Sequence, residues 1–129
     1  MARATEFTLT LEDKPGTLAD VAEALGKAGV NIDAMQGMAT GGKGMVSLVT
    51  NNPDGAKKVF DAAGLMTTSR EMLLVKLEDK PGALGKLARA MANAGVNITS
   101  GYIAMSGTVV LGVSDMAAAE KVVGGMGAM

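Results

Sequence analysis

The stretch LEDKPGTLADVAEALGKAGVNID at residues 11–33 returns as LEDKPGALGKLARAMANAGVNIT at residues 77–99. Fourteen of these 23 positions are identical at an offset of 66 residues. A repeat this sharp indicates two copies of one supersecondary unit. The sequence therefore predicts two modules, residues 1–71 and residues 72–129.

The first copy carries the periodicities of alternating strands and helices. Apolar residues at every second position from Phe7 to Leu11 predict a half-buried strand. Leu18, Val21 and Leu25 then follow at helical spacing, and Gly29 ends that helix. Further strands are expected at residues 31–38, 45–50 and 65–70, a glycine hairpin at 41–44, and a second helix at 53–63, capped by residue 52.

The second copy repeats this order, with a strand at 73–77, an apolar stripe from Leu84 to Met91, a hairpin at 105–107, a strand at 108–113 and a helix at 115–123. Both copies therefore read as βαββαβ units, the ferredoxin-like α+β fold with an antiparallel sheet. Only residues 124–129 remain for the last strand of the second copy, so we expect that strand to be short or missing. Its first strand would then be unpaired on one side.

Composition excludes several classes of function. The 129-residue chain has a net charge of −1, 2% aromatic residues, no His and no Cys. This argues against electrostatic nucleic-acid binding, base stacking, imidazole or thiolate catalysis, and metal sites built on His or Cys. No membrane-length apolar run or signal peptide is recognisable. We expect a cytoplasmic protein without catalytic residues, metal or cofactor.

A strand, the sequence Asp-Lys-Pro-Gly-x-Leu, an amphipathic helix and Ala-Gly-Val-Asn-Ile together resemble the ACT domain, twice over and across essentially the whole chain. The resemblance implies a small regulatory module that binds an amino acid and pairs side by side with other modules. The ligand would lie at the seam, and an enzyme of amino-acid metabolism is the implied partner. A free-standing tandem ACT protein is expected.

The repeated residues offer the chemistry that a zwitterionic amino acid requires. The helix after Gly16 has free N–H groups that favour a carboxylate, Asp13 can bind an ammonium group, and Asn31 adds an amide donor and acceptor. The candidate ligand-binding residues are Asp13, Lys14, Pro15, Gly16, Thr17, Asn31 and Ile32, and in the second copy Asp79, Lys80, Pro81, Gly82, Ala83, Asn97 and Ile98.

Simpler interpretations exist for each pattern. Asp-Lys-Pro-Gly is also ordinary turn chemistry. Residues 37–44 spell G-x-x-x-x-G-K, but Gly44 stands where a phosphate loop needs Ser or Thr, so a flexible hairpin is favoured. The strand methionines favour packing over copper binding.

Two functions remain after this comparison. The first is an amino-acid sensor without catalytic activity. The second is a regulatory subunit or protein-interaction module that has no ligand of its own. A homodimer is expected in either case, because sheet surfaces and strand edges need cover.

Overall fold

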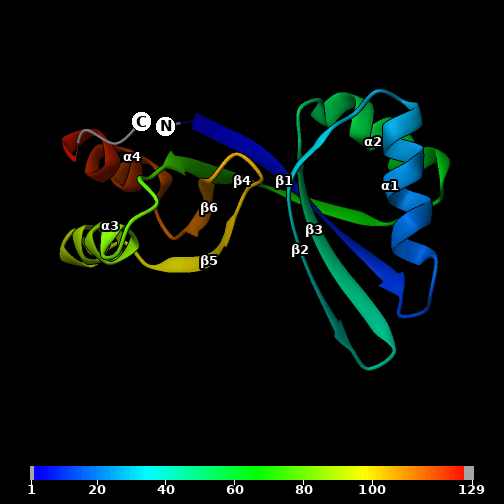
Figure 1. The fold of residues 1–129 in the computed structure, drawn as a ribbon, viewed down its shortest axis with the longest axis horizontal. Coiled ribbons are helices and arrows are strands. Elements are labelled where there is room, and N and C mark those ends of the chain that lie inside the picture. Colours follow the sequence, from blue (N-terminus) through cyan, green and yellow to red (C-terminus); the bar gives the residue numbers. More distant parts are fainter. Residues whose placement is uncertain (1, 127–129) are drawn as a thin grey trace. The chain divides into compact units, whose positions relative to one another are not determined.

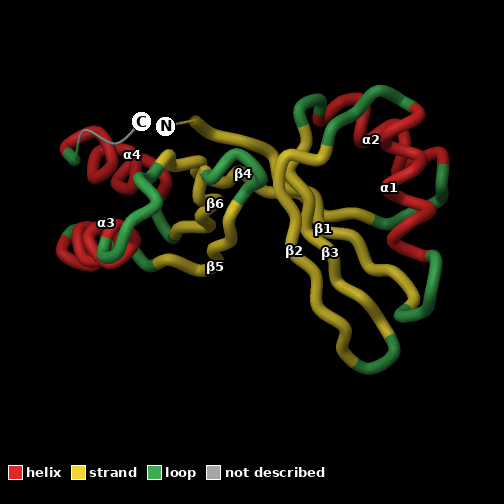
Figure 2. Tube along the Cα trace, in the orientation of Figure 1, coloured by secondary structure: helices red, strands yellow, loops and turns green. Residues whose placement is uncertain are grey.

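A computed structural model describes residues 2–126 of the chain. The strands are β1 (Ala2–Glu12), β2 (Ile32–Thr40), β3 (Lys43–Thr50), β4 (Thr67–Lys76), β5 (Ile98–Ile103) and β6 (Thr108–Val113). The helices are α1 (Thr17–Lys27), α2 (Pro53–Ala62), α3 (Ala83–Asn93) and α4 (Met116–Gly125). Figure 1 labels these elements, and Figure 2 colours them by type. The predicted order of strands and helices is confirmed, except that one strand replaces the two expected at 65–70 and 73–77.

Hydrogen bonds link the strands in the order β2-β3-β1-β4-β6-β5, and β3 pairs antiparallel with both β1 and β2. The chain forms two compact units: an N-terminal unit of residues 5–70, and a C-terminal unit that joins residues 2–4 to residues 71–126. Each unit has the ferredoxin-like arrangement of an antiparallel sheet with two helices, as the sequence predicts.

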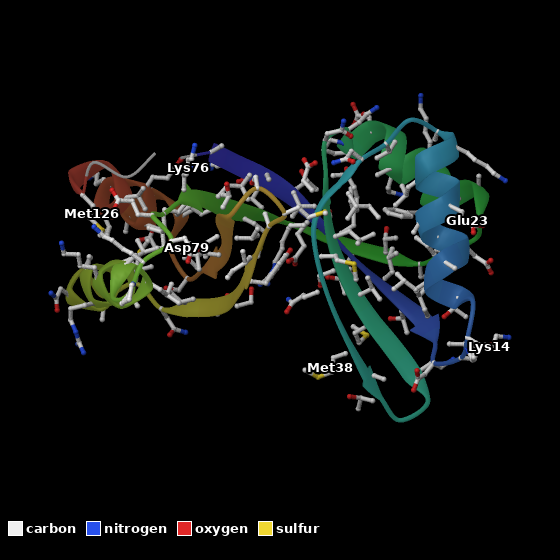
Figure 3. All side chains as sticks on the ribbon, viewed as in Figure 1. Lys14, Glu23, Met38, Lys76, Asp79 and Met126 are labelled. Atoms are coloured by element: carbon white, nitrogen blue, oxygen red, sulfur yellow. The ribbon has the colours of Figure 1, made fainter. Side chains whose placement is uncertain are left out.

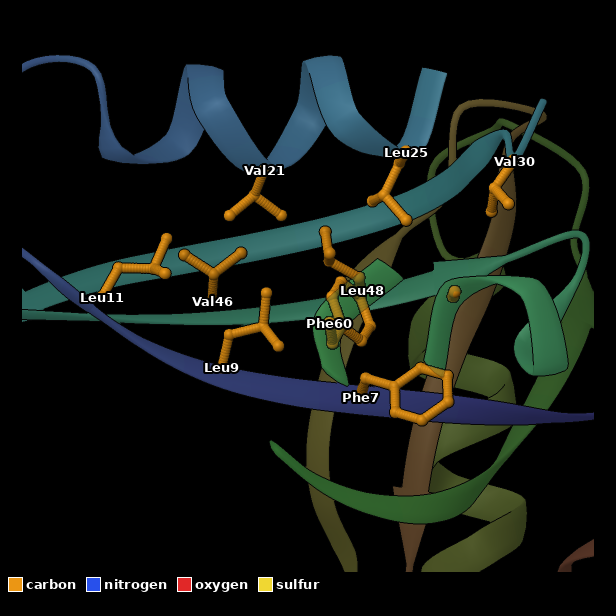
Figure 4. Packing of buried hydrophobic residues seen from close by; sticks show 10 residues of the cluster. Phe7, Leu9, Leu11, Val21, Leu25, Val30, Val46, Leu48 and Phe60 are labelled. Carbon is orange, nitrogen blue, oxygen red and sulfur yellow. The ribbon is translucent and has the colours of Figure 1, made fainter. Parts of the chain in front are cut away.

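The core of the N-terminal unit follows from the alternation along β1. Phe7 and Leu9 are buried and lie opposite Leu48 and Val46 of β3. Helix α1 adds two side chains that point toward the sheet, as Figure 4 shows. Helix α2 adds Phe60, whose ring meets that of Phe7 edge-on with centroids 5.4 Å apart. The helices therefore cover one face of this sheet, and the N-terminus of α1 lies at the end of the sheet where β1 finishes.

The C-terminal unit repeats this core with different side chains. Its buried residues are Leu73 and Val75 of β4, Val109 and Leu111 of β6, Leu87 and Met91 of α3, Val96, and Ala119 and Val123 of α4. Val123 takes the place that Phe60 has in α2, and Met91 takes that of Leu25 in α1. Each unit therefore buries its own apolar cluster.

Two expectations about these elements are wrong. Residues 65–70 and 73–77 are not two strands, because β4 runs without a break through 67–76. Leu18 and Leu84, expected in the helix cores, are 41% and 55% exposed. The first turns of α1 and α3 project past their clusters, so the buried stripes begin only at Val21 and Leu87.

The first strand of the second copy also has neighbours on both sides. Strand β4 lies between β1 and β6, so the expected unpaired edge is wrong. In the C-terminal unit, residues 2–4 of β1 take the place of the missing last strand. Arg3 Nη1 lies 3.1 Å from Glu71 Oε2, and Nη2 lies 2.5 Å from Glu120 Oε1. Of the residues left for a last strand, 124 and 125 finish α4, and 127–129 lie outside the described part of the chain.

We expect a fragment of residues 71–129 to lack a cooperative unfolding transition, because it has no strand to place beside β4 and no Arg3. A rearranged fragment, in which residues 2–5 follow residue 126 through a short Gly-Ser linker, should regain one. Circular dichroism during urea unfolding measures both. If the fragment alone unfolds as cooperatively as the rearranged one, the second module is formed by residues 72–129 alone, and residues 2–4 are not needed for it.

Candidate functional site

Residues 13–16 turn the chain from β1 into α1. Gly16 has φ 94° and stands at the N-cap of α1, a left-handed conformation that favours glycine. The Thr17 hydroxyl lies 2.8 Å from the Glu12 carbonyl oxygen and 3.2 Å from that of Lys14, and can donate to either. The Asp13 amide donates to the Gly42 carbonyl at 3.1 Å, which ties the loop to the β2–β3 hairpin. The loop is therefore held by its backbone and by Thr17.

The helices that follow the two glycine turns begin differently from the other two. Asn52 and Asp115 cap α2 and α4, each accepting a backbone N–H at 3.0 Å. Within the described chain, no side chain caps α1 or α3. The first amides of a helix carry partial positive charge and need an acceptor. The N-termini of α1 and α3 are therefore open to a carboxylate.

Charged side chains surround the first of these turns. Asp13 is exposed, and no described residue donates a hydrogen bond to its carboxylate. Lys14 Nζ lies 3.0 Å from Glu12 Oε2 at the outer edge of the turn (Figure 3). This hydrogen bond and charge, with a smaller contribution from Lys43, lower the pKa of Glu12. The Asp13 carboxylate therefore makes no hydrogen bond that holds the turn among the described residues.

Two concave surfaces border this turn. One of about 530 Å³ lies between α1 and α2, and we call it the interhelical pocket; its lining residues are Thr10, Leu11, Glu12, Lys14, Thr17, Asp20, Val21, Ala24, Val59, Ala63 and Leu65. The other, of about 380 Å³, runs along β2, and Asp13, Leu18, Met35 and Met38 are among its lining residues. We call it the strand groove. Lys14 and Thr17 line both, whereas Pro15 and Gly16 line neither.

Asn31 and Ile32 lie at the other end of the N-terminal unit. Ile32 pairs with Thr50, whereas Asp13 bonds to Gly42 beside the start of β3. The length of β3 between these levels is about 23 Å at roughly 3.3 Å per residue. The structure therefore does not bring Asn31 together with Asp13 within one module, as the zwitterion interpretation required.

Asn31 forms hydrogen bonds with residues at its own end of the unit. Its backbone N–H donates to Asn51 Oδ1 at 2.9 Å, and its side chain donates to Asp33 at 2.7 Å. Ile32 is half-buried against the core. In the second copy, the Asn97 amide donates to Ser114 Oγ at 2.9 Å and Ile98 packs against the core. These residues anchor the start of β2 and β5, and a ligand contact from them stays a prediction.

The turn at residues 79–83 repeats the backbone of the first but not all of its chemistry. Gly82 has φ 88°, and Lys80 Nζ lies 2.7 Å from Glu78 Oε2, which lowers the pKa of Glu78. Pro81 occupies the same position as Pro15, and Asp79 is exposed like Asp13. Ala83 has no hydroxyl to repeat the bonds of Thr17. The second turn thus forms without the threonine.

Sequence reasoning did not single out Asp20 as a candidate site residue. Asp20 lies in the first turn of α1 and lines the interhelical pocket with Glu12. The sequence did hold a sign that this position differs between the copies, because Lys86 stands there in the second copy and inverts the charge. Leu18 and Met38, 41% and 72% exposed, give the strand groove an apolar surface. Sequence reasoning also missed this surface, because it placed Leu18 in the core and took the strand methionines as packing residues.

Other candidate sites gain no support. Residues 37–44 form the end of β2, the turn at Gly41 and Gly42, and the start of β3, as the hairpin interpretation predicts. The described residues contain no group of three or more Asp or Glu side chains that could hold a metal ion. No helix among them is long and apolar enough to cross a membrane.

We expect Gly16→Ala to destabilise the protein by about 1–2 kcal/mol, because the Cβ of alanine makes the left-handed conformation unfavourable. A Cβ at this position meets no atom within 4 Å, so the loss reflects the backbone alone. Gly26→Ala, inside α1 and equally unobstructed, is the matched control and should stabilise by about 0.5–1 kcal/mol. Urea denaturation gives both values. Equal effects of the two substitutions would contradict this account of the turn.

We expect Lys14→Gln to raise the pKa of Glu12 toward its ordinary value of 4.5. Because the folded-state pKa lies below the unfolded one, the ion pair stabilises above the ordinary pKa, and this contribution disappears as the pH falls through the lowered value. Carboxyl NMR titration measures the change. Lys80→Gln, which removes the partner of Glu78, should leave Glu12 unaffected.

Comparisons with known proteins agree with this fold. The chain is 25% identical to protein BT0572 from Bacteroides thetaiotaomicron, with a TM-score of 0.90 over 98% of this chain and 90% of that one. It is 19% identical to the ligand-free regulatory subunit of aspartate kinase from Thermus thermophilus, with a TM-score of 0.68 over 93% and 87%. The corresponding subunit from Thermus flavus gives 21%, a TM-score of 0.60, and 94% and 90%.

A comparison with curated protein sequences gave no match. The family model of the ACT domain matches residues 5–63 and again residues 72–117. These segments fall on the two copies of the repeat and together span most of the sequence. The chain therefore belongs to the ACT domain family and carries two ACT domains in tandem.

Proposed function

We propose that this protein binds a free amino acid at the β1–α1 turn of its first ACT domain and reports its presence to a partner, without catalysing a reaction. The observation that carries the proposal is the start of α1. It begins at a left-handed glycine, and no side chain caps it among the described residues, whereas α2 has its own cap. A ligand carboxylate would supply the missing acceptor.

The remaining groups at the turn suit the other end of an amino acid. Asp13 offers a carboxylate that no described residue engages, and it follows β1 directly. An ammonium group could donate to it in a charge-assisted hydrogen bond. Lys14 and Glu12 add one charge of each sign, so each charged end of a zwitterion has a group of opposite charge at the turn.

A regulatory role fits the family and the similar structures. Two of those structures are named as regulatory subunits of aspartate kinase, and the similarity to them is one of fold. The absence of His and Cys from the sequence removes the commonest catalytic acid–base and thiolate groups. We propose an enzyme of amino-acid metabolism as the partner that responds to the bound ligand.

A second candidate function is an interaction module that has no ligand. The exposed side chains of Leu18, Met35 and Met38 in the strand groove favour it, because adaptable apolar side chains suit a protein contact. Recovery of a stoichiometric enzyme from native extract, equal with and without added amino acids, would support this function over sensing.

The homodimer and the cytoplasmic location stay predictions. Strands β2 and β5 stand at the two ends of the strand order, so each has an edge that lacks a neighbouring strand among the described residues. Such edges are commonly covered by another chain or protected. Light scattering at micromolar concentration tests the dimer. A mass near 13.0 kDa, that of one chain, would contradict it.

We expect Asp13→Ala to weaken amino-acid binding by roughly 10- to 150-fold, the loss typical of one charge-assisted hydrogen bond. The melting temperature should change little, since no described residue bonds to the Asp13 carboxylate. Asp79→Ala, at the same position in the second turn, should leave binding at the first site intact. Calorimetric titration with the twenty amino acids measures the affinities. No heat with any amino acid at about 10 mM would contradict the proposal.

A further inference from the structure

The interhelical pocket has a charged end and an aliphatic end. Thr17 and Asp20 lie in the first turn of α1, beside Glu12 and Lys14 of the β1–α1 turn. Val21 lies one turn beyond Thr17 on the same helix face, and Ala24 lies two turns beyond it. Both lining residues are apolar. Polarity therefore falls along α1, away from its open N-terminus.

The opposite wall is aliphatic as well. Helix α2 contributes Val59 and Ala63, and the segment after it contributes Leu65. The buried side chain of Leu11 lies beneath. No aromatic, amide or charged side chain belongs to this part of the lining. A polar group placed here would lose its hydration without gaining a partner from these walls.

The pocket has the size and charge of a small-molecule site. Its volume of about 530 Å³ falls within the roughly 300–1,000 Å³ common for ligand pockets. At its charged end, two carboxylates, Glu12 and Asp20, outnumber the single ammonium of Lys14. The hydrogen bond from Lys14 lowers the pKa of Glu12, so an ionised carboxylate lies at this end of the pocket, directly before Asp13 in the turn.

We infer that the interhelical pocket receives the side chain of the amino acid whose charged groups bind at the β1–α1 turn, and that this ligand is an aliphatic amino acid. The inference rests on the proposed function and specifies its ligand class. An extended aliphatic side chain leads from the charged end toward Val21, Ala24 and Val59. Binding would then bury CH₂ groups beside the apolar core, which is favourable in proportion to the area buried.

The second ACT domain differs at the equivalent positions of α3. Lys86 replaces Asp20, and the larger Leu87, fully buried in its own core, replaces Val21. Ala90 corresponds to Ala24 and is also half-buried. The selectivity for aliphatic side chains is therefore assigned to the first domain, and Ala90 offers a matched position for a control substitution.

A homologous series of ligands tests the inference on the intact protein. Calorimetric titration with alanine, 2-aminobutyrate and norvaline adds one CH₂ at a time. We expect the affinity to rise about fourfold with each added CH₂. In Ala24→Phe the new ring fills the pocket, so the rise should disappear. Ala90→Phe makes the same change in the second domain and should retain the rise.

Val59→Thr is the second test variant, because it keeps the shape of the side chain and places a hydroxyl in the aliphatic wall. It should reduce the rise even if Ala24→Phe fails to fold. An equal affinity for all three ligands in the unmodified protein, or a rise that survives both substitutions, would overturn the inference while leaving amino-acid binding intact. No binding of any of the twenty amino acids would overturn the proposed function with it.

Discussion

The left-handed backbone at Gly16 and Gly82 is the constraint on which both ACT domains depend. Each glycine stands at the end of the short connection from a strand to a helix, four residues long in the first domain and six in the second, and that helix then covers one face of the sheet. The same turn leaves the helix N-terminus without a side-chain cap in the described chain. One local conformation thus positions the core-forming helix and creates the partial positive charge that the proposed ligand needs.

Core and candidate site are continuous in the first domain. Leu11 and Val21 belong to the buried cluster and also line the interhelical pocket, and Val59 and Leu65 pack against that cluster. A ligand side chain in the pocket would therefore extend the core between α1 and α2. A ligand that binds only when α1 and α2 are packed in this way stabilises that packing. Its binding shifts any equilibrium with a different packing of the two helices toward the one seen here. This is a physical route by which ligand binding at the turn would reach a partner protein.

Much of the fold could be predicted from local patterns, because alternation in β1, the stripe of α1 and the cap at Asn52 each depend on neighbouring residues. The placement of residues 2–4 beside β4 could not, since no short motif marks a partner nearly 70 residues away. The turn at Asp13 was correctly located, whereas Asn31 lies at the other end of the N-terminal unit. In a βαβ unit the second strand starts at the end of the sheet opposite to where the first one finishes. The topology therefore separates Asn31, at the start of β2, from Asp13, which follows the end of β1. Asp20 was missed because a pocket between two helices leaves no periodic signal.

The most direct test of the central claim is an amide NMR titration of the intact protein with an amino-acid mixture. Binding at the open start of α1 predicts that the amide signals of residues 16–20 shift most, because the ligand carboxylate accepts from the first turn of that helix. Val21 and Ala24 should follow if the side chain enters the interhelical pocket. Shifts confined to residues far from this turn, such as those around Asn31, would contradict the account.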